Sequence, residues 1–195
     1  MTKPAAPAAS LALPATPATA ESAPTAPPDA ALRQALAQFA TGITVVTTRA
    51  PDGTPVGLTV NSFASVSLQP PLVLWCLALG ARSLAAFTAC ERYLIHVLGS
   101  DQLEVARRFT ARDADRFAAA DWHDNPNGLP LLDGGVAWLE CRNRGRHNEG
   151  DHVILVGEVT AFENRGGAPL IFHDSRYVTQ LTEAPLPTAL RSPWR

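Results

Sequence analysis

Cysteine is scarce in this sequence, and so are long apolar runs. Cys76, Cys90 and Cys141 are odd in number, widely spaced and set among apolar neighbours, which excludes a disulfide framework and a cysteine-rich metal site. They are typical of small core residues in a reducing compartment, so we expect a cytoplasmic protein. No apolar run approaches the roughly 20 residues that span a bilayer, so we expect no membrane partner.

The sequence also lacks strong charge and the common nucleotide and hydrolase motifs. Its net charge is -2 and its basic residues are dispersed, so we expect no nucleic-acid partner. It has no G-x-G-x-x-G after a strand, no Walker loop and no G-x-S-x-G elbow. These absences argue against a dinucleotide-binding α/β fold and an α/β hydrolase.

The 195 residues suffice for one domain with a full core but not for two. Residues 1–29 contain seven prolines and many alanines, and they cannot bury enough apolar surface to offset the entropy of ordering. We therefore expect a disordered tail at 1–29, a folded domain at 30–182 and a C-terminal tail at 183–195. Prolines interrupt every candidate signal-peptide core, so we expect no signal peptide.

Strands dominate the predicted domain. Helical spacing predicts helices at 29–39, 82–91 and 101–109, and a short one around Arg116 and Phe117. Runs of β-branched and apolar residues predict strands at 43–48, 57–68, 72–77, 93–98, 136–146, 152–162, 170–172 and 176–178. An Asn-, Gly- and Pro-rich loop is expected at 122–130. This order predicts a mainly β fold, a closed or split barrel with two or three peripheral helices.

The stretch Gly57–Leu77 holds hydroxyl and amide groups on a predicted strand without any charge. Those polar residues are Thr59, Asn61, Ser62, Ser65 and Ser67. On a strand, Thr59 and Asn61 share one face, as do Ser65 and Ser67, and such a surface suits a planar, hydrogen-bonding ligand with an apolar body. The alternative is an ordinary strand with Ser and Thr facing solvent.

Arg82 and Ser83 follow the apolar strand at the predicted start of a helix. A guanidinium, a hydroxyl and helix-start amides together suit a phosphate, although a solvated Arg beside a Ser N-cap is the equal alternative. His147 and His152 flank a turn, but their spacing does not require the imidazoles to converge, so we predict no metal site. His96 lies in an apolar strand and is expected to be a core histidine with satisfied hydrogen bonds.

Five segments together resemble the short-chain flavin reductase family. They are FATGITVVTT (Phe39–Thr48), PVGLTVNSFASVSLQPPLVLWCL (Pro55–Leu77), ARSLAAF (Ala81–Phe87), PLLDGGVAWLEC (Pro130–Cys141) and GDHVILVGEV (Gly150–Val159). The resemblance covers about residues 32–180. It implies an FMN-binding split barrel, a Greek-key antiparallel fold that forms a homodimer with flavin near the subunit interface. Apolar strand surface, including Trp75 and Trp138, is expected to lie in that interface.

The resemblance also implies a role for each matching residue. Thr59, Asn61 and Ser62 would line the flavin ring and ribityl chain, and Arg82 and Ser83 would hold the phosphate. Further flavin contacts would come from Ser65, Val66, Ser67, Thr41 and Thr44. His152 would be catalytic, at the place where the nicotinamide approaches the flavin. Ala81 and Leu84 depart from the polar residues that often flank the Arg-Ser pair in relatives.

The implied activity is that of an NAD(P)H:flavin oxidoreductase. It would use NADH or NADPH to reduce FMN or FAD, and a separate flavin-dependent monooxygenase would receive the reduced flavin. Two alternatives keep the fold: an oxidase with FMN as a tight prosthetic group, and a flavin-binding module without turnover. The sequence does not distinguish FMN from FAD or NADH from NADPH.

Overall fold

The computed structural model describes residues 29–112 and 115–182. The helices are α1 (Asp29–Leu36), α2 (Leu84–Ala89) and α3 (Leu103–Thr110). The strands are β1 (Thr41–Gly42), β2 (Thr44–Arg49), β3 (Pro55–Val60), β4 (Ala64–Leu68), β5 (Pro71–Ala78), β6 (Arg92–Val97), β7 (Trp122–Asp124), β8 (Pro130–Leu132), β9 (Ala137–Glu149), β10 (His152–Asn164), β11 (Ile171–His173) and β12 (Arg176–Val178). The predicted tails at 1–29 and 183–195 lie outside the described residues, except for Asp29, which begins α1.

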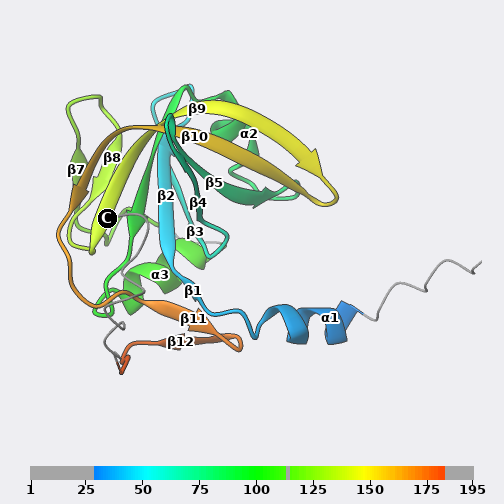
Figure 1. Cartoon of the computed structure of the whole chain (residues 1–195). Helices are drawn as coiled ribbons and strands as arrows, with labels where there is room; N and C mark the ends of the chain where they lie inside the picture. The colour runs from blue at the N-terminus through cyan, green and yellow to red at the C-terminus, as the bar shows by residue number, and fades with distance from the viewer. Residues whose placement is uncertain (1–28, 113–114, 183–195) are drawn as a thin grey trace, which may run out of the picture.

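Seven antiparallel strands form the main sheet, in the order β3-β2-β6-β9-β10-β5-β4 (Figure 1). The sheet curls around the core, and its two edge strands, β3 and β4, are consecutive in the chain but belong to opposite ends of the strand order. A barrel that remains open between two edge strands is a split barrel. The predicted mainly β, antiparallel fold with peripheral helices is therefore confirmed.

The hairpin of β9 and β10 provides the longest strands, drawn in yellow and gold in Figure 1. Its turn passes through Gly150, whose φ of 60° lies in the left-handed region that glycine adopts at little cost. His152 pairs with Glu149 across this hairpin and with Ala78 on β5. The predicted hairpin is confirmed, and its register fixes where His152 lies.

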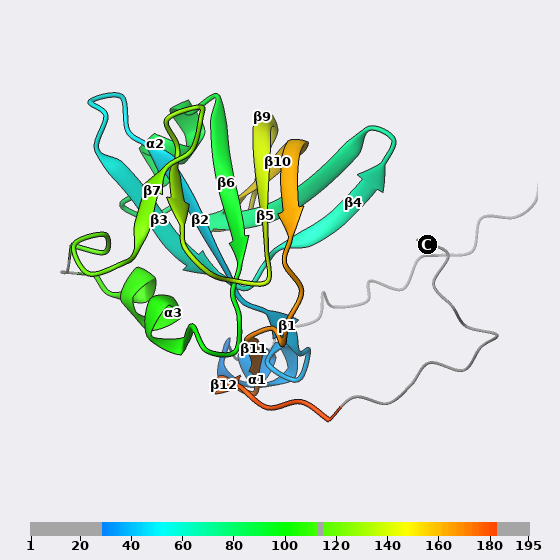
Figure 2. The same ribbon diagram turned by 90° about the vertical axis from the view of Figure 1, so that its left-hand side faces the viewer.

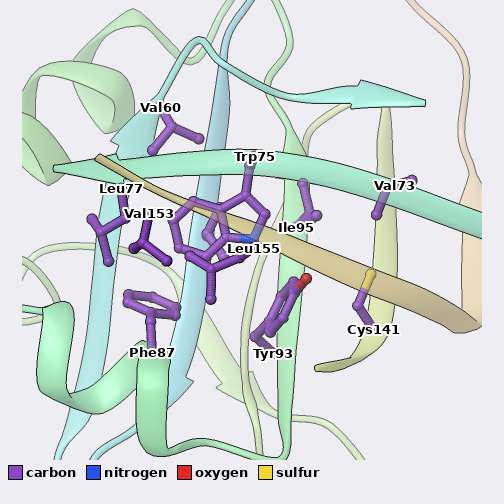
Figure 3. Packing of buried hydrophobic residues seen from close by; sticks show 11 residues of the cluster. Val60, Val73, Trp75, Leu77, Phe87, Tyr93, Ile95, Cys141, Val153 and Leu155 are labelled. Carbon is purple, nitrogen blue, oxygen red and sulfur yellow. The ribbon is translucent and has the colours of Figure 1, made fainter. Parts of the chain in front are cut away.

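Three aromatic residues form the centre of the main core (Figure 3). The ring of Trp75 lies 5.0 Å from that of Phe87 and 5.8 Å from that of Tyr93, both edge to face. Trp75 is fully buried because Val73, Trp75 and Leu77 alternate onto the inner face of β5. The prediction that Trp75 lies on an intersubunit surface is therefore wrong.

Helix α3 packs closely against the edge strand β3, and Gly57 makes this approach possible. A Cβ atom at Gly57 would lie 2.6 Å from Phe109 Cε1 and 3.2 Å from Phe117 Cζ. Without that atom the helix comes near enough for Thr59 Oγ1 to donate to the Ala106 carbonyl at 2.7 Å. Figure 2 shows α3 beside the lower end of the sheet.

The predicted continuous strand 57–68 is wrong, because β3 ends at Val60 and β4 begins at Ala64. Between them, Ser62 Oγ accepts from the Cys76 amide at 2.9 Å and donates to the Cys76 carbonyl at 3.2 Å. These two bonds tie the break to β5. A register shift between Ser65 and Ser67 also ends the simple alternation expected there.

Two predictions between residues 111 and 132 are wrong as well. The chain at Arg116 and Phe117 forms bends and turns instead of a helix. There, Asp115 Oδ1 accepts from the amides of Phe117 and Ala118 at 3.0 and 3.2 Å, a local alternative to helical hydrogen bonds. The predicted loop 122–130 contains β7, which pairs with β8.

His96 is the satisfied core histidine that its apolar strand predicted. Its Nδ1 lies 3.0 Å from the Val45 carbonyl oxygen, and its Nε2 accepts from the Leu132 amide at 3.1 Å. The proton therefore resides on Nδ1. Burial lowers the pKa of His96 to about 4, so the imidazole is neutral at physiological pH.

Helix α1 and a small sheet of β1, β11 and β12 lie to one side of the barrel (Figure 1). The amide of Asp174, in the β11–β12 turn, donates to the Ala37 carbonyl at 2.8 Å and ties the end of α1 to this sheet. None of the residues of α1 is buried in the described part of the chain. Within residues 29–112 and 115–182, no helix has the length and apolar character needed to cross a membrane.

Candidate functional site

Three adjoining cavities follow the free edge of β3, and we call them together the β3 groove. The first cavity adjoins Thr59, Val60 and Asn61, the middle one adjoins Leu58 and Thr59, and the last adjoins Pro55, Val56 and Gly57. Because β3 rises about 3.3 Å per residue, the groove is on the order of 20 Å long. The split in the barrel thus leaves an extended site along one edge strand.

The middle cavity has a volume of about 520 Å³ and lies between β3, the start of α2 and the end of α3. Its lining combines apolar walls with hydroxyls and three guanidinium groups. The residues are Leu58, Thr59, Ala78, Gly80, Ala81, Arg82, Ser83, Phe109, Thr110, Arg112 and Arg116. Such a volume and such a mixture of groups are typical of a small-molecule site.

Arg82, Arg112 and Arg116 concentrate positive charge in this cavity. Arg82 Nη1 donates to the Arg112 carbonyl at 2.7 Å, and Arg116 Nη1 donates to the Gly57 carbonyl at 2.6 Å on the edge of β3. Partial burial, followed by the charge of Arg82, lowers the pKa of Arg116. Clustered guanidinium groups of this kind fit a phosphate, which accepts several charge-assisted hydrogen bonds.

The structure brings together Thr59, Arg82 and Ser83 of the predicted site residues. Helix α2 begins one residue after Ser83 and is only six residues long, and the Ser83 hydroxyl makes no capping bond within the described residues. The positive charge therefore comes from side chains, not from a long helix. Arg112 and Arg116 were missed by the sequence analysis, although the run from Arg108 through Arg112 to Arg116 repeats every four residues.

Thr44 and Ser62 are placed in the framework. Thr44 is 2% exposed, and its hydroxyl donates to the Val60 carbonyl at 3.3 Å. The hydroxyl of Ser62 holds the main chain of Cys76. In this chain both residues therefore hold the main chain at the end of β3 and at the break before β4, and their direct contact with flavin stays a prediction.

The remaining predicted flavin contacts are spread over both edges of the main sheet and the small sheet that contains β1. Asn61 is exposed and lines the first cavity beside Thr59. On the opposite edge strand, β4, Ser65 and Val66 are exposed and Ser67 is half-buried. Thr41 has a buried hydroxyl without a hydrogen-bond partner among the described residues.

His152 begins β10 next to Ala78, which lines the middle cavity. Its side chain is 46% exposed, and its Nδ1 lies 2.7 Å from Asp151 Oδ1. That bond, with the nearby imidazole charge, holds the pKa of Asp151 below its usual value. The Asp151 carbonyl also accepts from the Leu79 amide at 2.9 Å, so the turn that carries the imidazole is fixed beside the cavity.

No group of three or more His, Cys, Asp or Glu side chains in the described ranges could hold a metal ion. His147 and His152 lie on facing strands of the hairpin, where His147 pairs with Ile154 and His152 pairs with Glu149. The two histidines are therefore not cross-strand partners, and the hairpin does not place their imidazoles opposite each other.

A family model described as "Flavin reductase like domain" matches residues 36–180. The FMN reductase (NADH) SmoA of Agrobacterium fabrum is 48% identical over 142 residues, which cover 73% of this chain and 80% of that protein. The reductase subunit HsaB of a flavin-dependent monooxygenase from Rhodococcus jostii is 39% identical over 164 residues, covering 84% and 82%. The chain spans 44% and 59% of the lengths of two other, longer relatives.

Solved structures similar to this chain also include flavin reductases. The NADH:FAD oxidoreductase SgcE6 of Streptomyces globisporus superposes with a TM-score of 0.76 at 35% sequence identity, covering 84% of this chain and 100% of that chain. The family match covers most of the described domain, in agreement with the split barrel and the groove at its open edge. The chain therefore belongs to the flavin reductase family.

Proposed function

We propose that this protein is an NAD(P)H-dependent flavin reductase that supplies reduced flavin to a separate monooxygenase. The observation that carries the proposal is the β3 groove, in which three guanidinium groups lie between apolar walls and beside the turn that bears His152. Relatives that include an FMN reductase (NADH) and a reductase subunit of a flavin-dependent monooxygenase support it.

A flavin bound in the groove would supply the site that accepts a hydride from the nicotinamide. The residues of the chain then bind and orient. Arg82, Arg112 and Arg116 hold the flavin phosphate, and Thr59 and the apolar walls position the part nearer the ring. His152 orients the nicotinamide at the mouth of the groove, where Asp151 fixes the imidazole through Nδ1.

The proposed activity is tested by mixing the purified protein anaerobically with NADH or NADPH and with FMN, FAD or riboflavin. We expect rapid bleaching of at least one flavin, and a nearly colourless preparation because flavin is a substrate that leaves. A yellow, stoichiometric preparation that a nicotinamide does not bleach would contradict the proposal and favour a flavin-binding module. A yellow protein that oxidises a small substrate would favour the oxidase.

Arg82→Ala is expected to weaken binding of FMN by about 1.5 to 3 kcal/mol, while riboflavin binding changes little, because riboflavin has no phosphate. Flavin fluorescence titration measures both dissociation constants. The matched control is Arg107→Ala, because Arg107 pairs with Glu104 on the exposed side of α3 and does not line the middle cavity among the described residues. Equal weakening of FMN and riboflavin would remove Arg82 from phosphate binding.

His152→Ala is expected to slow flavin reduction by the nicotinamide about tenfold or more, with the dissociation constant of oxidised FMN within a few-fold of wild type. Stopped-flow absorbance separates the two quantities. His123→Ala is the control, since His123 is similarly exposed and pairs with Asp133 at 3.0 Å, away from the groove. An unchanged reduction rate would remove His152 from the reaction.

We further propose that the protein is a homodimer. The expected interface residue Trp75 is buried in the core, but apolar side chains elsewhere remain exposed. They include Leu36 at 65% at the end of α1, Phe39 at 79% just after this helix, and Leu68 at 62% on the edge strand β4. Leu36 and Phe39 are three residues apart at the end of α1, and a pair of large exposed apolar side chains of this kind fits a contact between subunits.

Sedimentation velocity is expected to give a dimer at micromolar concentration. The double variant Leu36→Asp, Phe39→Asp is expected to shift the distribution toward monomer, because charge would then enter an apolar contact. Ala161→Asp, which adds a negative charge at the exposed end of β10, serves as the control for introducing charge at an exposed position. A monomeric wild type would overturn the proposal.

A further inference from the structure

The β3 groove continues past the arginines into a larger, mostly apolar cavity. This last cavity has a volume of about 600 Å³ and shares Arg82, Arg112 and Arg116 with the middle cavity. The guanidinium groups therefore stand between two compartments. A flavin mononucleotide that ends at its phosphate would leave the second compartment unfilled.

We propose that the last cavity binds the adenosine half of FAD, with the pyrophosphate lying across the three arginines, so that FAD is the preferred flavin. This inference rests on the proposed flavin reductase function. It deepens that function by naming which flavin the site selects and which residues select it.

The charge distribution supports a pyrophosphate at the junction. Two linked phosphates carry more negative charge than one, and three guanidinium groups at one place offer more donors than a single phosphate requires. Arg116 is anchored to the edge of β3 by its bond to the Gly57 carbonyl, and its Nε donates to the Ala111 carbonyl at 2.9 Å. It is thus held at the junction of the two cavities.

The walls of the last cavity suit a flat heteroaromatic base. Ala85 and Ala89 present small side chains on one face of α2, and Pro51 and Pro55 contribute rigid apolar surface from the β2–β3 hairpin. Phe117 also lines the cavity and is held by edge-to-face contacts with Phe109 and Trp122, at 5.0 and 5.2 Å between ring centroids. Base contact with an aromatic side chain stabilises binding without a charge.

The carboxylate of Asp115 in the last cavity favours binding of a nucleobase over binding of a further phosphate. The carboxylate of Asp115 lines the cavity, and its Oδ1 accepts from the amides of Phe117 and Ala118. A carboxylate accepts hydrogen bonds from an exocyclic amine such as that of adenine, but it repels a phosphate. The groove therefore changes from phosphate-binding to base-binding along its length.

The adenosine diphosphate group occurs in both FAD and NADH, so the experiment must separate them. We would measure the dissociation constants of FAD, FMN and riboflavin without nicotinamide, and KM for NADH with riboflavin as acceptor. Ala89→Phe fills the cavity from an exposed position on α2, and Ala119→Phe adds the same group at an exposed position outside the lining. Melting temperatures confirm that both variants fold.

We expect wild type to bind FAD about tenfold or more tightly than FMN, a difference of about 1.4 kcal/mol. Ala89→Phe should remove this preference and leave FMN, riboflavin and KM for NADH within about twofold, while Ala119→Phe changes none of them. ADP should compete with FAD on the wild type but not with riboflavin, which tests the cavity without any substitution.

Equal affinity for FAD and FMN in the wild type would overturn the inference. So would an Ala89→Phe variant whose KM for NADH rises while FAD binding is unchanged, because the cavity would then serve the nicotinamide cofactor. In both cases flavin is still bound and reduced, so the proposed function survives. If no flavin binds to the folded wild type, the proposed function fails together with the inference.

Discussion

Replacing Glu140 with alanine is expected to lower the free energy of unfolding by about 3 kcal/mol. Glu140 lies on β9 and is 3% exposed, and its carboxylate accepts from Arg92 Nη1 at 2.9 Å, from Asn125 Nδ2 at 2.9 Å and from Asn127 Nδ2 at 2.8 Å. Alanine would leave these donors without their acceptor, and Asn125 is itself buried. Urea denaturation followed by circular dichroism measures the loss.

The large expected loss of stability depends on the burial of Glu140, and replacing an exposed glutamate tests this dependence. Glu104 pairs with Arg107 at 2.7 Å on α3, but its side chain is 76% exposed. Glu104→Ala is therefore expected to cost about 0.5 kcal/mol or less. Glu140→Gln should fall between the two alanine variants, because it keeps the shape but loses the charge. If Glu140→Ala and Glu104→Ala destabilised the protein equally, the buried network would not stabilise the fold.

The hydrogen-bond network around Glu140 could not be predicted from the sequence. Glu140 occurs in an ordinary strand pattern, and its partners are distant in the chain: Arg92 is 48 residues away and Asn125 is 15 away. Asn125 lies in the segment 122–130, whose Asn, Gly and Pro content predicts a loop. That composition indicates neither the strand β7 nor the hydrogen bond from the Asn125 amide to the Glu140 carboxylate. The pairing of β6 with β9 brings Arg92 near Glu140, and the turn between β7 and β8 places Asn125 against the same carboxylate.

The fold itself followed from local patterns. The β-branched run 43–48 predicted β2, and the Asn-Glu-Gly turn at 148–150 predicted the β9–β10 hairpin; both are confirmed. Residues 58–68 contain no charged residue, glycine or proline that would end a strand, so the sequence predicts one strand at 57–68. The bonds of Ser62 to Cys76 instead mark the break between β3 and β4. Periodicity reports the local path of the chain and does not show a tertiary hydrogen bond.

Local patterns also predicted part of the candidate site. Thr59, Arg82 and Ser83, which line one cavity, were predicted as site residues because the strand that carries Thr59 and the strand-to-helix junction that carries Arg82 and Ser83 have clear local patterns. Arg112 and Arg116 reach the groove only because α3 packs on β3 over Gly57, a contact that depends on the missing side chain of one glycine. No local pattern relates residue 57 to residue 116, although Arg116 donates directly to the Gly57 carbonyl.

Gly157→Ala is expected to destabilise the protein by about 3 kcal/mol, the upper part of the range for overpacking a core. A Cβ atom at this position would lie 2.9 Å from Cys141 Cβ and 3.0 Å from Tyr93 Cζ, and it would overlap the Tyr93 hydroxyl. Tyr93 is fully buried and packs edge to face against Trp75, so its ring has little freedom to move away. Urea denaturation again measures the change.

Gly145→Ala, in the same hairpin, separates this overlap from the general effect of replacing glycine. A Cβ atom at Gly145 would meet His147 Nε2 at 3.5 Å and Val156 Cβ at 3.9 Å, which are ordinary contacts, so we expect little change in stability. Tyr93→Phe removes the hydroxyl that the Cβ of Gly157→Ala would strike. That hydroxyl has no hydrogen-bond partner among the described residues, so its removal alone should cost little. The double variant should therefore be more stable than Gly157→Ala, and a purely additive loss would show that the Tyr93 hydroxyl is not the group that requires glycine at position 157.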